Sequence, residues 1–94
     1  FNGYLPIDKQ VRRKTLKVLE RKVQEGQSQL FIETPYRNQQ LLSDLIETLQ
    51  PDTLLCIATD LTLPTESIRT LPIRQWKHTS VDLQKRPTLF IIGR

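Results

Sequence analysis

The sequence predicts an α/β domain, with a mixed sheet of about four to five strands flanked by helices. Short apolar runs of strand length alternate with two longer segments whose apolar residues recur every three to four positions. The 94 residues are enough for one domain, and 37% hydrophobic with 26% charged residues is typical of a folded globular protein. Alternating strands and helices favour helices packed on a sheet over a helical bundle.

The first helix is expected to follow an extended N-terminal segment, residues 1–7. Asp8 can cap its start, and Gly26 is placed to end it. The apolar residues between them fall near helical spacing, which predicts a stripe facing the core: Val11, Leu16, Leu19 and Val23.

A buried strand is predicted at residues 29–33, and a second helix at residues 37–49. The helix has an apolar face that should pack inward: Leu41, Leu42, Leu45, Ile46 and Leu49. The next strand, residues 53–59, is almost entirely apolar. This composition favours a central strand covered on both faces, and it predicts that Cys56 is a small buried residue.

The C-terminal third is predicted to hold three short elements. These are a strand at residues 66–70, a short helix at residues 72–78, and a final strand at residues 87–92. Trp76 is expected to pack in the core rather than to stack on a nucleic-acid base. The polar residues 79–86 are typical of a surface loop.

The candidate site lies in the turns that follow two predicted strands. The strand ending at Ile32 continues into Glu33-Thr34-Pro35-Tyr36-Arg37, and the strand ending at Thr59 continues into Asp60-Leu61-Thr62. Ligands of α/β proteins collect at such strand ends, where turns leave backbone groups unpaired. The carboxylates of Glu33, Asp60 and Glu66 could converge there. Alternatively, at least one of them caps a helix or pairs with Arg37 or Arg69.

Several classes of site are excluded by residue type. The three glycines, Gly3, Gly26 and Gly93, are far apart in the sequence, so there is no phosphate-binding glycine loop. One histidine and one cysteine cannot form a structural zinc site, and His78 offers no credible catalytic triad; no metal is expected. The chain has no apolar run of about 20 residues and no signal-peptide pattern, so a cytoplasmic location without membrane contact is expected.

The positive charge is concentrated in the first helix. The chain has a net charge of +4, and the helix carries seven of its 14 basic residues: Lys9, Arg12, Arg13, Lys14, Lys17, Arg21 and Lys22. A basic helix face is the electrostatic signature of nucleic-acid binding. The alternative is an ordinary solvated helix face.

Five motifs in order resemble one family, the small-subunit ribosomal RNA ribose-2′-O-methyltransferases of the tetrapyrrole methylase superfamily. The resemblance is to their second domain and spans nearly the whole chain. The motifs are Gly3-Tyr4-Leu5-Pro6, then Arg12-Arg13 with Leu16, then Phe31-Ile32-Glu33-Thr34-Pro35-Tyr36-Arg37, then Ala58-Thr59-Asp60-Leu61-Thr62, and finally Glu66. This sequence departs from the family at Asp60, where the family has glutamate, and at Leu63, where it has lysine.

The resemblance implies that residues 1–7 are an interdomain linker and residues 8–94 the C-terminal domain of a two-domain enzyme, the second domain of the tetrapyrrole methylase fold. S-adenosylmethionine would lie in the cleft shared with an N-terminal domain that these residues do not include. The backbone of four residues would contact the cofactor: Glu33, Thr34, Leu61 and Thr62. Three arginines would contact RNA phosphates: Arg12, Arg13 and Arg37.

The activity implied by the resemblance is methyl transfer to a ribosomal RNA ribose 2′-hydroxyl. A small-molecule tetrapyrrole or corrin acceptor remains open, as does a noncatalytic RNA-binding module. The resemblance assigns no catalytic residue in this chain, and the fragment alone is expected to be inactive. The implied partners are ribosomal RNA and the chain's own N-terminal domain, with a homodimer left open.

Overall fold

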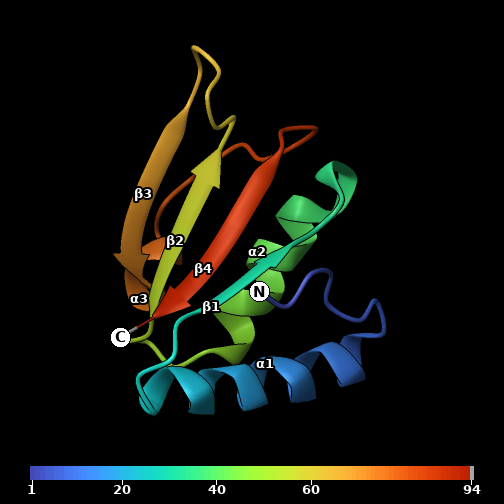
Figure 1. The fold of residues 1–94 in the computed structure, drawn as a ribbon, viewed down its shortest axis with the longest axis vertical. Helices are drawn as coiled ribbons and strands as arrows, with labels where there is room; N and C mark the ends of the chain where they lie inside the picture. Colours follow the sequence, from blue (N-terminus) through green and yellow to red (C-terminus); the bar gives the residue numbers. More distant parts are fainter. Residues whose placement is uncertain (94) are drawn as a thin grey trace.

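The computed structural model describes residues 1–93 (Figure 1). Its strands form one four-stranded sheet in the order β1-β4-β2-β3. The strands are β1 (Gln29–Ile32), β2 (Leu54–Thr59), β3 (Ser67–Pro72) and β4 (Thr88–Gly93). The helices are α1 (Lys9–Gln24), η1 (Pro35–Arg37, a 3₁₀ turn), α2 (Asn38–Thr48) and α3 (Ile73–Trp76). The α/β class is confirmed, and each predicted element is present within a few residues.

The four strands pair only in antiparallel fashion. β1 and β2 both pair with β4, so they run in the same direction on either side of it. The N-terminal segment adds a parallel bridge between Tyr4 and Ile32. The Ile32 N–H donates to the Gly3 carbonyl at 2.9 Å, and the Asn2 N–H donates to the Leu30 carbonyl at 2.8 Å. Among residues 1–93, the mixed character of the sheet therefore comes from this segment alone.

The helices cover one face of the sheet. In Figure 1, α2 and α3 lie behind the strands and α1 runs below them. Phe31 and Phe90 are fully buried on the covered face and stack with ring centroids 6.0 Å apart. On the other face the side chains are partly exposed although they are uncharged: Leu30, Ile32, Leu54, Cys56, Leu89 and Ile91. We call this the open face.

The open face corrects two predictions. β2 is central, as predicted, but the described residues cover it on one face only. Cys56 is therefore partly exposed rather than buried. The apolar residues of β2 on the open face led to the prediction that both faces are buried. The composition of a strand shows that its side chains are hydrophobic, but it does not show whether another element covers them.

Three of the four residues predicted to form the inner stripe of α1 are buried, namely Leu16, Leu19 and Val23. Asp8 caps the helix as expected, because its Oδ1 accepts the Val11 N–H at 3.0 Å. Val11 itself is 49% exposed. Two of the buried residues of α1 are charged, Arg12 and Glu20. The full buried set is Arg12, Leu16, Leu19, Glu20 and Val23. The helix is thus docked on the domain by charged groups as well as by leucines.

The predicted core positions of α2 and α3 are confirmed. The inner face of α2 is buried at Leu41, Leu42, Leu45 and, just past its end, Leu49, with Ile46 packed against this cluster. Trp76 is 1% exposed, and its indole N–H donates to the Leu55 carbonyl at 2.9 Å. The polar loop before β4 also hides one apolar side chain, the fully buried Leu83. No helix among residues 1–93 is long and apolar enough to cross a bilayer.

Replacing Phe90 with alanine should lower the free energy of unfolding by about 3–5 kcal/mol, because it removes a fully buried ring from the covered face. The neighbouring change Ile91→Ala, on the open face, should cost clearly less. Urea unfolding followed by circular dichroism measures both. Equal losses would show that the two faces of the sheet are buried alike in solution.

Candidate functional site

Both predicted turns emerge at the same end of the sheet. Leu89 of β4 pairs with Ile32 on one side and with Ala58 on the other. The turn after β1 and the turn after β2 therefore flank the start of β4. We call this end of the molecule the rim, and define it as residues 33–37, 60–66 and 83–87. The juxtaposition expected from the two strand ends is confirmed.

The loop before β4 joins the two turns. On one side the Asp60 N–H donates to the Pro87 carbonyl at 3.0 Å, and on the other the Lys85 N–H donates to the Pro35 carbonyl at 3.3 Å. Beneath them, the fully buried Asn38 donates its side-chain N–H to the Arg86 carbonyl at 2.7 Å. The three parts of the rim thus form one hydrogen-bonded unit.

Asp60 anchors the second turn through its carboxylate. It accepts hydrogen bonds from Arg86, with Nε 2.9 Å and Nη2 2.8 Å from Oδ2, and from the Thr65 hydroxyl at 2.8 Å. The bonds from Arg86 and then Thr65 lower the pKa of Asp60 below its ordinary value of 3.8. Asp60 is therefore ionised at neutral pH, and its lowered pKa makes it a poor proton acceptor.

Backbone strain is concentrated on the rim. Within residues 1–93, three residues other than glycine have positive φ angles, and all three belong to the rim: Asp60 at 52°, Thr62 at 68° and Lys85 at 59°. A β-branched residue such as threonine rarely adopts this conformation. Strain of this kind persists where the surrounding structure imposes it, and it clusters at functional sites.

The first turn is held by Glu33, whose side chain points inward. Glu33 is 7% exposed; its Oε2 accepts from Nη2 of Arg12 at 2.6 Å, and its Oε1 accepts the Thr34 N–H at 2.8 Å. In the second turn, the Thr62 N–H donates to Oε1 of Glu66 at 2.9 Å. Two of the backbone N–H groups predicted to meet a cofactor are thus already satisfied.

Leu61 combines an unpaired backbone with exposure to solvent, whereas Glu33 is buried. The Leu61 N–H and carbonyl make no hydrogen bond to any residue in the range 1–93, and its side chain is 42% exposed. Tyr36 and Leu63, 73% and 50% exposed, also lie on the rim. The rim therefore offers unpaired backbone groups at Leu61 and apolar side chains around them.

The three predicted carboxylates do not converge. Glu33 is paired with Arg12, Asp60 with Arg86, and Glu66 with the Thr62 backbone. Each carboxylate therefore has a partner of its own, as the alternative interpretation of the sequence expected, but the partners are not Arg37 and Arg69. No group of three or more histidine, cysteine or acidic side chains comes together within the described residues to hold a metal ion.

Arg12 is buried, which corrects its assignment to an RNA-contacting surface. The residue is 3% exposed. Its Nε donates to the Pro6 carbonyl at 2.8 Å, and its Nη1 and Nη2 donate to Asp44 at 3.0 Å and to Glu33 at 2.6 Å. The charge of the residue and its position in the sequence do not show that Arg12 is buried while the other basic residues of α1 are exposed. Its guanidinium connects the N-terminal segment, α1, the first turn and α2.

Arg13 and Arg37 are exposed, as a phosphate-contacting role requires. Arg13 forms an exposed ion pair with Glu47 at 3.0 Å. Arg37 lines a hollow of about 350 Å³ together with Lys9 and Gln40. The remaining basic residues of α1 are also exposed, which leaves a positive face along the helix: Lys9, Lys14, Lys17, Arg21 and Lys22. The N-terminal part of α1 contacts the first turn, through Arg12 and Glu33.

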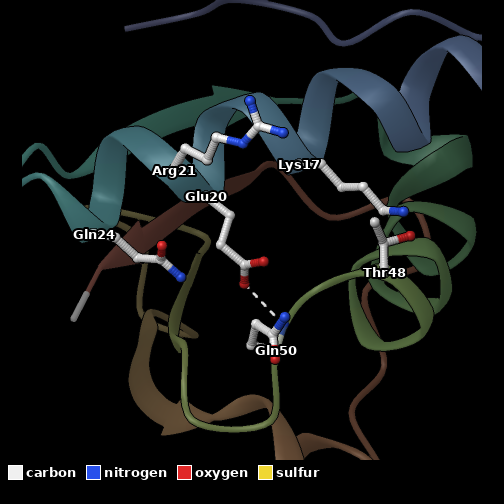
Figure 2. A pocket seen from close by; sticks show the side chains of 6 residues that line it. All are labelled: Lys17, Glu20, Arg21, Gln24, Thr48 and Gln50. Atoms are coloured by element: carbon white, nitrogen blue, oxygen red, sulfur yellow. Dashed lines mark hydrogen bonds between the residues drawn. The ribbon is translucent and has the colours of Figure 1, made fainter.

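A second hollow, of about 330 Å³, lies where α1 meets the end of α2 (Figure 2). Its lining residues are Lys17, Glu20, Arg21, Gln24, Thr48 and Gln50. Figure 2 shows Glu20 directed toward Gln50, whose N–H donates to its carboxylate at 2.8 Å. The Thr53 hydroxyl donates to the same oxygen at 2.6 Å. Glu20 is therefore committed to joining α1 to the turn before β2, and this hollow contains no rim residue.

No protein-family profile and no curated protein sequence matches this chain. Among solved structures, the methyltransferase CobJ is similar to it in fold, with a TM-score of 0.63 and 18% sequence identity. The similarity covers 100% of this chain and 41% of the CobJ chain. The chain thus has the fold of part of a methyltransferase and spans less than half the length of this neighbour.

Replacing Arg12 with alanine should lower the free energy of unfolding by about 3–5 kcal/mol, because Glu33 and Asp44 would then be buried without a counter-charge. Arg13→Ala is the matched control, and the loss of its exposed ion pair should cost no more than about 1 kcal/mol. Urea titrations at neutral pH compare the two. Similar losses would contradict a buried network at Arg12.

Proposed function

We propose that this chain is the C-terminal domain of a two-domain methyltransferase that uses S-adenosylmethionine, with the rim as one wall of the cofactor cleft. The observation that carries the proposal is the juxtaposition of the two turns, the second of which is strained at Asp60 and Thr62 and has an unpaired backbone at Leu61. The similarity to CobJ supports it, because the chain matches less than half of that methyltransferase. The other wall would belong to an N-terminal domain.

The rim would act by positioning the cofactor. Methyl transfer from a sulfonium requires the acceptor to approach in line with the breaking bond, so holding both partners accounts for much of the rate. Glu33 and Asp60 are each paired with an arginine, and neither is available as a general base. A base, if the reaction uses one, would come from the N-terminal domain or the acceptor.

The preferred acceptor is the ribose 2′-hydroxyl of ribosomal RNA. The exposed basic face of α1, together with Arg37 beside the first turn, supports an RNA phosphate backbone running past the rim. The alternative acceptor is a small tetrapyrrole or corrin. The exposed apolar side chains of Tyr36, Leu61 and Leu63 favour it, because a flat hydrophobic molecule can pack on them.

A noncatalytic RNA-binding module is the second alternative. Such a module needs only the basic face of α1, and it would have no use for the strain at Asp60, Thr62 and Lys85. The homodimer also remains a proposal. The open face, which is apolar and uncharged, is a surface on which a second copy or the N-terminal domain could pack.

The cofactor proposal is tested on the full-length protein that contains this chain. Calorimetric titration should show that it binds S-adenosylmethionine, and that Leu61→Pro, which removes the unpaired N–H, weakens binding at least tenfold. Val18→Ala, a change on the exposed side of α1, is the control and should leave binding unchanged. The 94-residue chain alone should not bind tightly. Tight binding by the chain alone, or no effect of Leu61→Pro, would contradict the proposed cleft.

The RNA proposal is tested by the salt dependence of binding to a ribosomal RNA fragment. Arg13→Ala and Arg37→Ala should each weaken binding and reduce the slope of log K against log salt by about 1, as expected for one lost phosphate contact. Arg74→Ala removes an equal charge beside the opposite edge of the sheet and should change neither quantity. Equal effects of all three changes would indicate attraction by net charge alone.

A further inference from the structure

The outer edge of β3 is unpaired. β3 is the last strand in the sheet order, and within residues 1–93 it pairs only with β2. Figure 1 shows it at the margin of the sheet, with the β2–β3 hairpin extending beyond the other strands. In an antiparallel strand, every second residue directs its N–H and carbonyl away from the partner strand. The edge therefore presents a row of unused hydrogen-bonding groups.

A hollow of about 500 Å³ lies beside this edge. Arg69 and Leu71 of β3 contribute to it, and they pair with Ile57 and Leu55, whose side chains are on the covered face. The rest of the lining comes from α3 and the residues that follow it: Arg74, Gln75, His78 and Thr79. The hollow is therefore on the helix side of the sheet. A strand added to β3 would direct every second side chain toward it.

The charge around the hollow is positive. The Arg69 guanidinium lies 5.9 Å from the centre of the Trp76 ring, where cation–π attraction holds it beside the edge. Arg74 is paired with Asp52, but both partners are exposed, so the ion pair is weak. Arg74 can therefore bind a further carboxylate. Leu71 supplies an apolar part of the lining.

The opposite face of an added strand would meet a different surface. Ile68 is on the open face and is 61% exposed. An aliphatic side chain beside it would continue the apolar open face by one strand. The two faces of the edge thus favour alternating acidic and aliphatic residues, which is the pattern of an extended peptide.

We propose that the β3 edge is a peptide-binding site, which takes an extended segment of a protein partner by strand addition. Backbone hydrogen bonds to β3 supply affinity, and Arg69 and Arg74 select carboxylates at alternate positions. A second copy of the chain fits less well, because its β3 edge carries Arg69 and offers no carboxylate to the arginines of the first copy. The site does not depend on the proposed methyltransferase function, since none of the residues that line the hollow belongs to the rim.

The test uses a fluorescein-labelled peptide of seven residues that alternates valine and glutamate, titrated with the 94-residue chain and followed by anisotropy. Saturable binding is expected. Arg69→Glu and Arg74→Glu should each weaken it at least tenfold. The matched control is Arg13→Glu, an equal charge reversal at an exposed ion pair of α1, which should change affinity less than twofold. Far-UV circular dichroism of each variant checks that it is folded.

Two further probes separate strand addition from charge attraction. A peptide methylated on the alternate backbone nitrogens that would face β3 keeps its charge. It cannot form the hydrogen bonds of an added strand, so it should not bind. The amide protons of β3 should also exchange more slowly when the unmodified peptide is bound. Equal binding of the methylated peptide would overturn the proposal. So would a result in which Arg69→Glu weakens binding of a single-stranded RNA oligonucleotide but not that of the peptide.

Discussion

The buried guanidinium of Arg12 is the interaction on which this domain most depends. It binds the carbonyl of Pro6, the carboxylate of Asp44 on α2 and the carboxylate of Glu33 at the end of β1. Arg12, Glu33 and Asp44 are all buried, and their charges are stable there only as a paired set. Removing one partner would leave a buried charge without a counter-charge, at a large desolvation cost. The N-terminal segment, α1, α2 and the first turn are therefore fixed relative to one another by one side chain.

This constraint extends to the rim. Arg12 orients Glu33, and the second oxygen of Glu33 accepts the Thr34 N–H, so the first turn takes its shape from a buried ion pair. The second turn is built in the same way, with Asp60 held by Arg86. Both acids serve to position backbone. If the rim binds a ligand as proposed, its backbone and exposed apolar side chains would make the contacts, and proton transfer would need groups elsewhere.

Two surfaces of the domain have no packing partner among the described residues, the open face of the sheet and the outer edge of β3. The open face is hydrophobic and uncharged, so a partner there would bury apolar area. The β3 edge offers backbone hydrogen bonds with arginines beside them, so a partner there would add a strand. In the proposed two-domain protein, the first kind of contact would lie between the two domains. The second kind suits a separate protein.

The sequence by itself determined the class of fold, the order of its elements, the apolar face of α2 and the position of the two polar turns, because these depend on local periodicity and turn chemistry. It determined Leu16, Leu19 and Val23 on the inner face of α1 but not the charged residues beside them. Arg12 is one of seven basic residues in this helix, and only the approach of Glu33 and Asp44 makes it the buried one. Nor did it determine that one face of β2 is open. Burial and ion pairing depend on what packs against a residue, which is decided by contacts between segments far apart in the chain.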